Sequence, residues 1–209
     1  SADTTGEIID LMVKGMGLSV EQSLISQREI FATATALGVA PSKMASDFAA
    51  AAPKLAAFGD KAIQKFRELS TVAKAAGMEV TNLLDIAEKF ETIEGAADIV
   101  GQLNSVLGVS FDSLNMTTLA LENPQQALMT LQKGFKESGK DFDSMSVAMK
   151  KSLAGIMGME VDKLARFLRT DLTAQAAAAN EVAISQDKLN DMIRKATPVW
   201  EKMQTAVLG

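Results

Sequence analysis

The feature that most constrains the fold of this chain is a glycine joint that recurs along it. At each joint an apolar helical run ends at a glycine, an apolar residue follows, and a run with a polar or proline start begins. The joints are Gly17-Leu18-Ser19-Val20, Leu37-Gly38-Val39-Ala40-Pro41, Ala76-Gly77-Met78-Glu79-Val80, Leu107-Gly108-Val109-Ser110 and Met157-Gly158-Met159-Glu160-Val161. Because glycine readily adopts the left-handed conformation that ends helices, each joint predicts a corner between two helices. The gaps between these glycines are irregular, so no fixed-period solenoid is predicted.

Between the joints, apolar residues recur with the helical period, as at Ile63, Phe66 and Leu69. Asn123-Pro124 is a typical helix start, with Asn as the cap and Pro at the first helical position. Apolar residues make up 47% of the chain but aromatic residues only 5%, and small apolar side chains suit packed helices better than sheets. We therefore predict an all-α fold, a multi-helix bundle jointed by glycines. The predicted helices lie near 7–16, 20–37, 42–51, 53–58, 60–76, 81–90, 92–107, 112–121, 124–138, 144–156 and 160–197.

The C-terminal stretch differs, because no glycine occurs between Gly158 and Gly209. Alternating steps of four and three residues, the heptad spacing of a coiled coil, predict a long helix with an oligomerising seam. An amphipathic helix packed on its own domain is the alternative interpretation. Pro198 should kink or restart the helix after Thr197. The seam consists of ten apolar residues and the polar Gln175 and Gln186: Leu168, Leu172, Gln175, Ala179, Val182, Gln186, Leu189, Ile193, Ala196, Trp200, Met203 and Val207.

These patterns predict two domains, a compact helical domain over 1–159 and a long helix over 160–209. A chain of 209 residues is long enough to bury a core of its own. Because it begins with Ser1 and not with Met, we expect it to be a piece of a longer protein. No apolar run reaches the roughly 18 residues of a membrane-spanning helix, and the start does not resemble a signal peptide.

Catalytic equipment is scarce in this sequence. His, Cys and Tyr are absent, so the commonest general base and the usual thiol and imidazole metal ligands are missing. The densest acidic group is Asp85, Glu88, Glu91 and Glu94, whose steps of three predict neighbouring turns of one helix. It could bind a hard cation or supply an acid and a base, but a solvated helix face is the favoured interpretation. We therefore predict no enzymatic activity, no cofactor and no metal site.

Nucleic acid is not a predicted partner. The net charge of −5 disfavours non-specific binding to DNA or to an anionic membrane. The glycine turn before Pro41, Ser42 and Lys43 suggests a DNA-reading helix-turn-helix, but the helix that follows is apolar and slightly acidic. A group of methionines could form an adaptable partner surface, although core packing is the favoured role. This group is Met145, Met149, Met157 and Met159.

Six stretches between 37 and 124 together resemble one protein family. They are Leu37-Gly38-Val39-Ala40-Pro41 with Asp47, Phe58-Gly59-Asp60-Lys61, Ala73-Lys74-Ala75-Ala76-Gly77-Met78, Ile86-Ala87-Glu88-Lys89-Phe90-Glu91-Thr92-Ile93-Glu94, Gly101-Gln102-Leu103-Asn104 and Leu119-Ala120-Leu121-Glu122-Asn123-Pro124. In order and spacing they resemble the tail tape measure proteins of tailed bacteriophages, especially a helical region found in marine and cyanobacterial phages. Under half of the chain is covered. The Ala-rich stretch over 49–53 departs from the family pattern, and the C-terminal third does not take part.

The resemblance implies a structural virion protein of the tail lumen or tail tip, with the host cytoplasm as its place during assembly. It implies that several copies of the protein form a parallel homo-oligomer, which contacts tail tube and baseplate hub proteins. The implied roles are tail length determination, tail assembly and DNA ejection. Because a continuous helix gains about 1.5 Å per residue and corners fold a chain back, 1–160 are expected to form a compact terminal domain and not the ruler itself. A helical partner-binding or effector domain without catalytic activity is the alternative.

Overall fold

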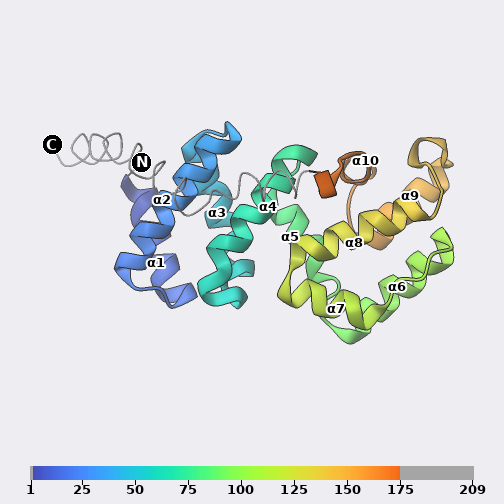
Figure 1. Ribbon diagram of the computed structural model, residues 1–209, viewed down its shortest axis with the longest axis horizontal. Coiled ribbons are helices and arrows are strands. Elements are labelled where there is room, and N and C mark those ends of the chain that lie inside the picture. The colour runs from blue at the N-terminus through green and yellow to red at the C-terminus, as the bar shows by residue number, and fades with distance from the viewer. Residues whose placement is uncertain (1, 175–209) are drawn as a thin grey trace. The chain divides into compact units, whose positions relative to one another are not determined.

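The computed structural model describes residues 2–174 of the chain (Figure 1). Within that range all regular structure is helical, with ten α-helices, two short 3-10 helices and no strand. The all-α prediction is therefore confirmed for this range. No helix between residues 2 and 174 is long and apolar enough to cross a bilayer.

The described residues divide into two compact units, and the boundary follows Arg67, inside a helix. Unit 1 contains residues 2–67 and unit 2 contains residues 68–174. The predicted domains, 1–159 and 160–209, include residues outside the described range, and that division stays a prediction.

Unit 1 is built from three helices and the start of a fourth. They are α1 (Ala2–Met16), α2 (Val20–Leu37), α3 (Pro41–Leu55), the 3-10 helix η1 (Ala56–Lys61) and the first part of α4 (Ala62–Ala76). The helices α1, α2 and α3 all pack against one another. In its core the rings of Phe48 and Phe66 meet edge to face, with centroids 5.1 Å apart, and Met12 and Leu55 are fully buried. The helices are held by this apolar interior, since aromatic pairs of this geometry add to simple burial.

Unit 2 contains the rest of α4 and six further α-helices. These are α5 (Val80–Glu88), α6 (Ile93–Leu107), α7 (Ser113–Glu122), α8 (Pro124–Glu137), the 3-10 helix η2 (Phe142–Ser144), α9 (Val147–Met157) and α10 (Val161–Arg169). Helix α8 packs against α5, α7 and α10, while α6 packs against α7 and α9. Fully buried side chains from several of these helices and from the α5–α6 turn fill the interior: Leu83, Phe90, Leu103, Met116, Leu128, Leu131, Leu153, Leu164 and Phe167. Helix α8 therefore occupies a central place in this unit.

The five glycines of the predicted joints each follow the last residue of a helix. All five have positive φ, from 60° at Gly77 to 73° at Gly108. At three of them the amide of the next residue returns to a carbonyl in the last helical turn, Val39 to Ala34, Met78 to Ala73 and Met159 to Ala154, each at 2.9 Å. This is the bonding of a glycine-terminated helix end. The predicted helix ends are confirmed at these glycines, whereas a single Gly-jointed bundle stays a prediction.

The predicted break between helices over 42–51 and 53–58 is wrong, because α3 runs through Pro53 to Leu55. Proline is expensive in a helix interior because it removes one hydrogen bond. Pro53 lies in the last turn and is exposed, so only the carbonyl of Ala49 loses its amide partner, close to solvent. The cost is small enough for the helix to continue.

The predicted continuous helix over 160–197 is also wrong within the described range. Helix α10 ends at Arg169, and Thr170 is extended, with φ −75° and ψ 131°. A new helical turn begins at Leu172. The chain therefore makes a corner at 170–171, which side chains of α8 hold in place.

Candidate functional site

The acidic group singled out in the sequence does not form one helix face. Asp85 and Glu88 belong to α5, Glu91 lies in a turn, and Glu94 is on α6. The turn forms because the buried Phe90 and the cap of Thr92, whose Oγ1 accepts from the amide of Gly95 at 3.1 Å, start a new helix. The single-face interpretation is wrong for that reason. Among residues 2–174, no group of three or more acidic, His or Cys side chains is placed to hold a metal ion.

The helix-turn-helix candidate and the methionine group are largely built into the units. After the turn, Met44 is buried in unit 1, and Lys43 pairs with Asp47 one turn along the same helix. In unit 2, Met145 and Met157 are buried, which confirms core packing for these two. Met149 and Met159 are half-buried, and no methionine in the described range is exposed. The described methionines do not form an exposed partner surface.

The predicted seam starts at the corner after α10. Leu168 is half-buried on α10, and Leu172, beyond the corner, is fully buried in unit 2. Because Thr170 between them is extended, the two leucines are not one turn apart on a single helix. The seam as a whole stays a prediction. Its other members lie outside the described residues: Gln175, Ala179, Val182, Gln186, Leu189, Ile193, Ala196, Trp200, Met203 and Val207.

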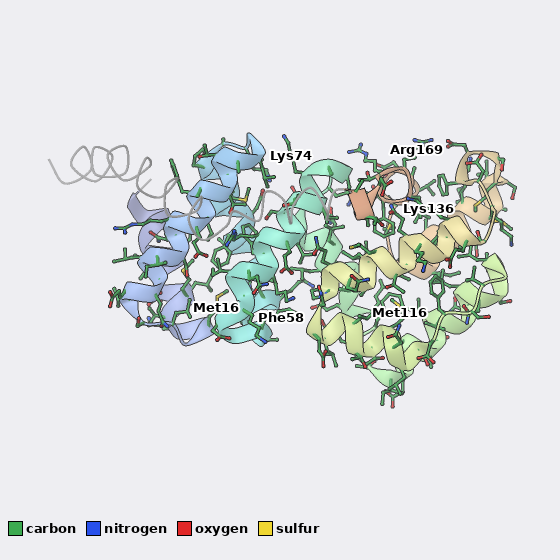
Figure 2. The ribbon with its side chains drawn as sticks, in the orientation of Figure 1. Met16, Phe58, Lys74, Met116, Lys136 and Arg169 are labelled. Atoms are coloured by element: carbon green, nitrogen blue, oxygen red, sulfur yellow. The ribbon has the colours of Figure 1, made fainter. Side chains whose placement is uncertain are left out.

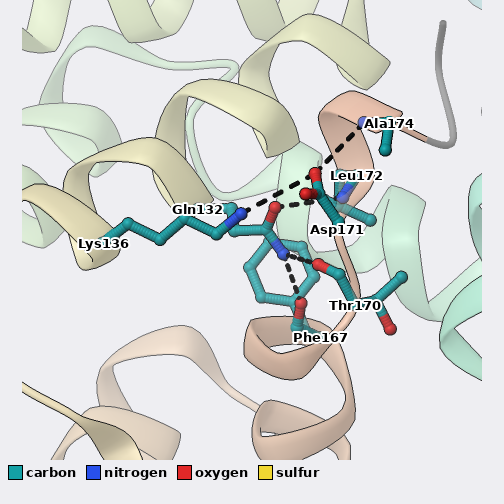
Figure 3. A network of polar contacts seen from close by, with 7 residues as sticks. All are labelled: Gln132, Lys136, Phe167, Thr170, Asp171, Leu172 and Ala174. Carbon is teal, nitrogen blue, oxygen red and sulfur yellow. Dashed lines mark hydrogen bonds and ion pairs between the residues drawn. The ribbon is translucent and has the colours of Figure 1, made fainter.

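A buried network of hydrogen bonds surrounds this corner, which we call the exit corner and define as residues 167–174. Gln132 reaches it from α8 and is only 1% exposed. Its Nε2 donates to the carbonyls of Phe167, at 2.7 Å, and of Thr170, while its Oε1 accepts from the amide of Leu172 at 3.1 Å (Figure 3). The Leu172 amide is shared with the Thr170 carbonyl, also at 3.1 Å. One buried side chain therefore bonds the backbone before, at and after the break.

A second side chain of α8 reaches the exit corner one turn after Gln132. The Nζ of Lys136 lies 3.7 Å from a carboxylate oxygen of Asp171, and the same oxygen accepts from the amide of Ala174 at 3.1 Å (Figure 3). The amide of Ala174, and after it the charge of Lys136, hold the pKa of Asp171 below its usual value of 3.8. Asp171 is thus both the cap of the next turn and an ion-pair partner of α8.

The last turn of α10 binds other parts of unit 2 through its two arginines. Arg169, labelled with Lys136 in Figure 2, pairs with Asp143 of η2, and this hydrogen bond is the main reason why the pKa of Asp143 lies below its usual value. Arg166 donates to the carbonyl of Gly77, at the end of α4, at 3.2 Å. Cations near helix C-termini are favourable, because terminal carbonyls lack intrahelical partners.

The loop between α6 and α7 is held against the other side of α8. The side chain of Asn104 accepts from the amide of Phe111 at 2.8 Å and donates to its carbonyl at 3.1 Å. The Phe111 ring lies over Gly134 of α8, where an added Cβ would come within 2.1 Å of it. An open hollow of about 230 Å³ borders this contact. Its carboxylates already have structural partners, since Asp112 caps α7 and Glu137 pairs with Lys133.

Sequence reasoning missed Gln132 and Asn104. A signal for Gln132 was present, because it is a polar residue within the apolar stripe formed by Leu128, Leu131 and Phe135 of α8. Asn104 carried no such signal, since its partner Phe111 is in a loop whose path the local pattern does not define. Both amides serve the backbone of other segments, which is a structural role.

Comparison of the chain with protein-family models, curated proteins and solved structures gives no match. Functional inference therefore depends on the residues and their geometry.

Proposed function

We propose that this chain is a non-catalytic structural segment of a tail tape measure protein of a tailed bacteriophage. It acts in the virion, in the tail lumen or at the tail tip, and in the host cytoplasm during assembly. It works by helix packing and self-association, as a Gly-jointed bundle. The C-terminal seam joins parallel copies through its members from Gln175 onward, because Leu172 is buried within unit 2. Its partners are further copies of itself, the tail tube and the baseplate hub. The whole tape measure protein acts in tail length determination, tail assembly and genome ejection, and this chain contributes one domain of it.

The observation that carries this proposal is the ordered series of resembling stretches between 37 and 124. Most of them fall where helices end or begin: the ends of α2 and α4, η1, the α5–α6 turn and the α7–α8 junction. Such positions depend on specific turn and cap residues, whereas helix interiors accept many apolar sequences. Agreement at these positions is therefore more informative than agreement within helices of similar composition.

Helix length supports a terminal domain and not the ruler itself. A continuous helix over residues 2–174 would extend about 260 Å at about 1.5 Å per residue. The longest described helix, α2, has 18 residues and extends only about 27 Å. A ruler gains length from unbroken helices, so we assign this part of the chain to the tail tip or baseplate hub.

Electron microscopy of purified tails labelled with an antibody against residues 2–174 tests the proposal. Tails opened with mild detergent should carry label at one end, while intact tails with a closed lumen serve as the comparison. Label on neither preparation, with the antibody still recognising the purified chain, would contradict a virion role and favour a helical partner-binding or effector domain.

A deletion separates the terminal-domain assignment from tape measure identity. Removal of α6 and α7 takes out 30 residues, 93–122. In a ruler this deletion shortens the tail by about 45 Å, since each helical residue spans about 1.5 Å. We expect tails of unchanged length or a failure of tail assembly. Proportional shortening would contradict the terminal assignment while leaving the tape measure identity intact.

A further inference from the structure

The exit corner interrupts a stretch whose sequence contains no helix breaker. Neither glycine nor proline occurs between Met159 and Thr197. Thr170 and Asp171 are weaker helix formers than Ala or Leu, but each is tolerated in helix interiors. Helix propensity alone therefore does not keep Thr170 extended.

The hydrogen bonds of Gln132 are those that a continuous helix would make for itself. In such a helix the Phe167 carbonyl accepts from the amide of residue 171, the Thr170 carbonyl accepts from residue 174, and the Leu172 amide donates to residue 168. In the structure Gln132 provides the partner for each of these groups. One side chain of α8 thus replaces the helical partners on both sides of the break.

Asp171 and Lys136 add to this arrangement at the surface. The amide of Ala174, which in a continuous helix would bond the Thr170 carbonyl, donates to the Asp171 carboxylate instead. Lys136 holds that carboxylate from α8. Because Asp171 is exposed, this second contact can be removed without opening the core.

We propose that the exit corner is a conformational switch in which Gln132 and Lys136 of α8 hold the chain bent at Thr170. Loss of these contacts leaves the Phe167 carbonyl without a partner, and leaves the Thr170 carbonyl and the Leu172 amide with only each other, at 3.1 Å. The unbroken helix provides a helical partner for all three groups. Release from α8 therefore extends α10 across Thr170 as one helix to Ala174. The device converts a docked, bent end of unit 2 into a straight one. It does not depend on the proposed tape measure role.

The test uses Gln132→Met in the full chain, because Met keeps the length of the side chain and removes both its donor and its acceptor. Asp171→Ala weakens the second contact at an exposed position. Gln126→Met is the matched control, since Gln126 is exposed on the same helix. The measurements are the ¹³Cα chemical shift of Thr170 and the NOE between Hα of Arg169 and the amide of Leu172.

In the unmodified chain and in Gln126→Met, the Thr170 shift should be that of extended backbone and the NOE should be absent. In Gln132→Met the shift should change sign to the helical value and the NOE should appear. Asp171→Ala should move the shift in the same direction by a smaller amount. If the Gln132→Met variant does not fold, the Thr170 chemical shift in Asp171→Ala tests the proposal. An unchanged extended shift in the folded variants, or a random-coil shift, would overturn the proposal.

Discussion

At the scale of single residues, side-chain amides hold the loops and corners of unit 2. Asn104 bonds both the amide and the carbonyl of Phe111, and Gln132 bonds three backbone groups of the exit corner. A backbone amide or carbonyl that is buried without a hydrogen-bond partner destabilises the folded chain. An amide side chain, with a donor and an acceptor at one end, can serve both kinds of backbone group at once.

Asn104→Ala should lower the free energy of unfolding by about 1–3 kcal/mol, the usual cost of leaving partly buried polar groups unsatisfied. The measurement is urea denaturation followed by circular dichroism. Gln102→Ala, which removes only an exposed hydrogen bond to Asp98 on the same helix, is the control and should change stability by less than about 0.5 kcal/mol. An equal loss of stability in the two variants would mean that the α6–α7 loop does not depend on the hydrogen bonds between Asn104 and Phe111.

Gly134→Ala should also destabilise the chain, by about 1–3 kcal/mol, because the new Cβ collides with the Phe111 ring. Gly155→Ala in α9 is the matched control, since no atom lies within 4 Å of its added Cβ. There the substitution should stabilise the helix by about 0.5–1 kcal/mol, because alanine is the better helix former. Thermal unfolding of both variants measures whether their stabilities change in opposite directions. A Gly134→Ala variant more stable than the unmodified chain would contradict the close contact between the Phe111 ring and Gly134.

The ion pair between Asp143 and Arg169 predicts a pH effect. The hydrogen bond from Arg169 lowers the pKa of Asp143 in the folded chain. The ion pair therefore contributes its full stability at pH values above the pKa that Asp143 has in the unfolded chain. This stability is lost as the pH falls through the lower pKa that Asp143 has in the folded chain. Arg169→Gln should return the pKa of Asp143 toward 3.8. Carboxyl ¹³C NMR titration measures this change, with Asp171, whose cation is Lys136, as the internal reference. An unchanged Asp143 midpoint would show that the pair does not form in solution.

At the scale of elements, the sequence predicted the helix ends that depend on a single residue, and it missed the features that depend on residues distant in the chain or on exposure to solvent. The five glycine ends were predictable because a positive φ is a property of one residue. The continuation of α3 through Pro53 was missed because its cost depends on how near the helix end and solvent are. The corner after α10 was missed because Gln132 is 38 residues before Thr170 in the chain. For the same reason, the candidate site around the exit corner was not predicted.

At the scale of the whole molecule, the proposed function depends on the ordered resemblance over 37–124, and the contacts of unit 2 are consistent with it. The polar contacts of Asn104, Gln132, Lys136 and Arg169 in unit 2 join side chains to backbone groups or form ion pairs between segments of that unit. That use of polar side chains suits a protein that works through its shape and its contacts with copies and partners. The described helices, each of 18 residues or fewer, have the lengths that the proposed terminal domain requires.

Quantitative peptide mass spectrometry of purified virions tests the central claim most directly. Peptides from residues 2–174 should be present in several copies per virion. When virions are separated into heads and tails, these peptides should be found in the tail fraction. Their absence from virions, while they are abundant in the infected cell, would contradict the assignment to the phage tail.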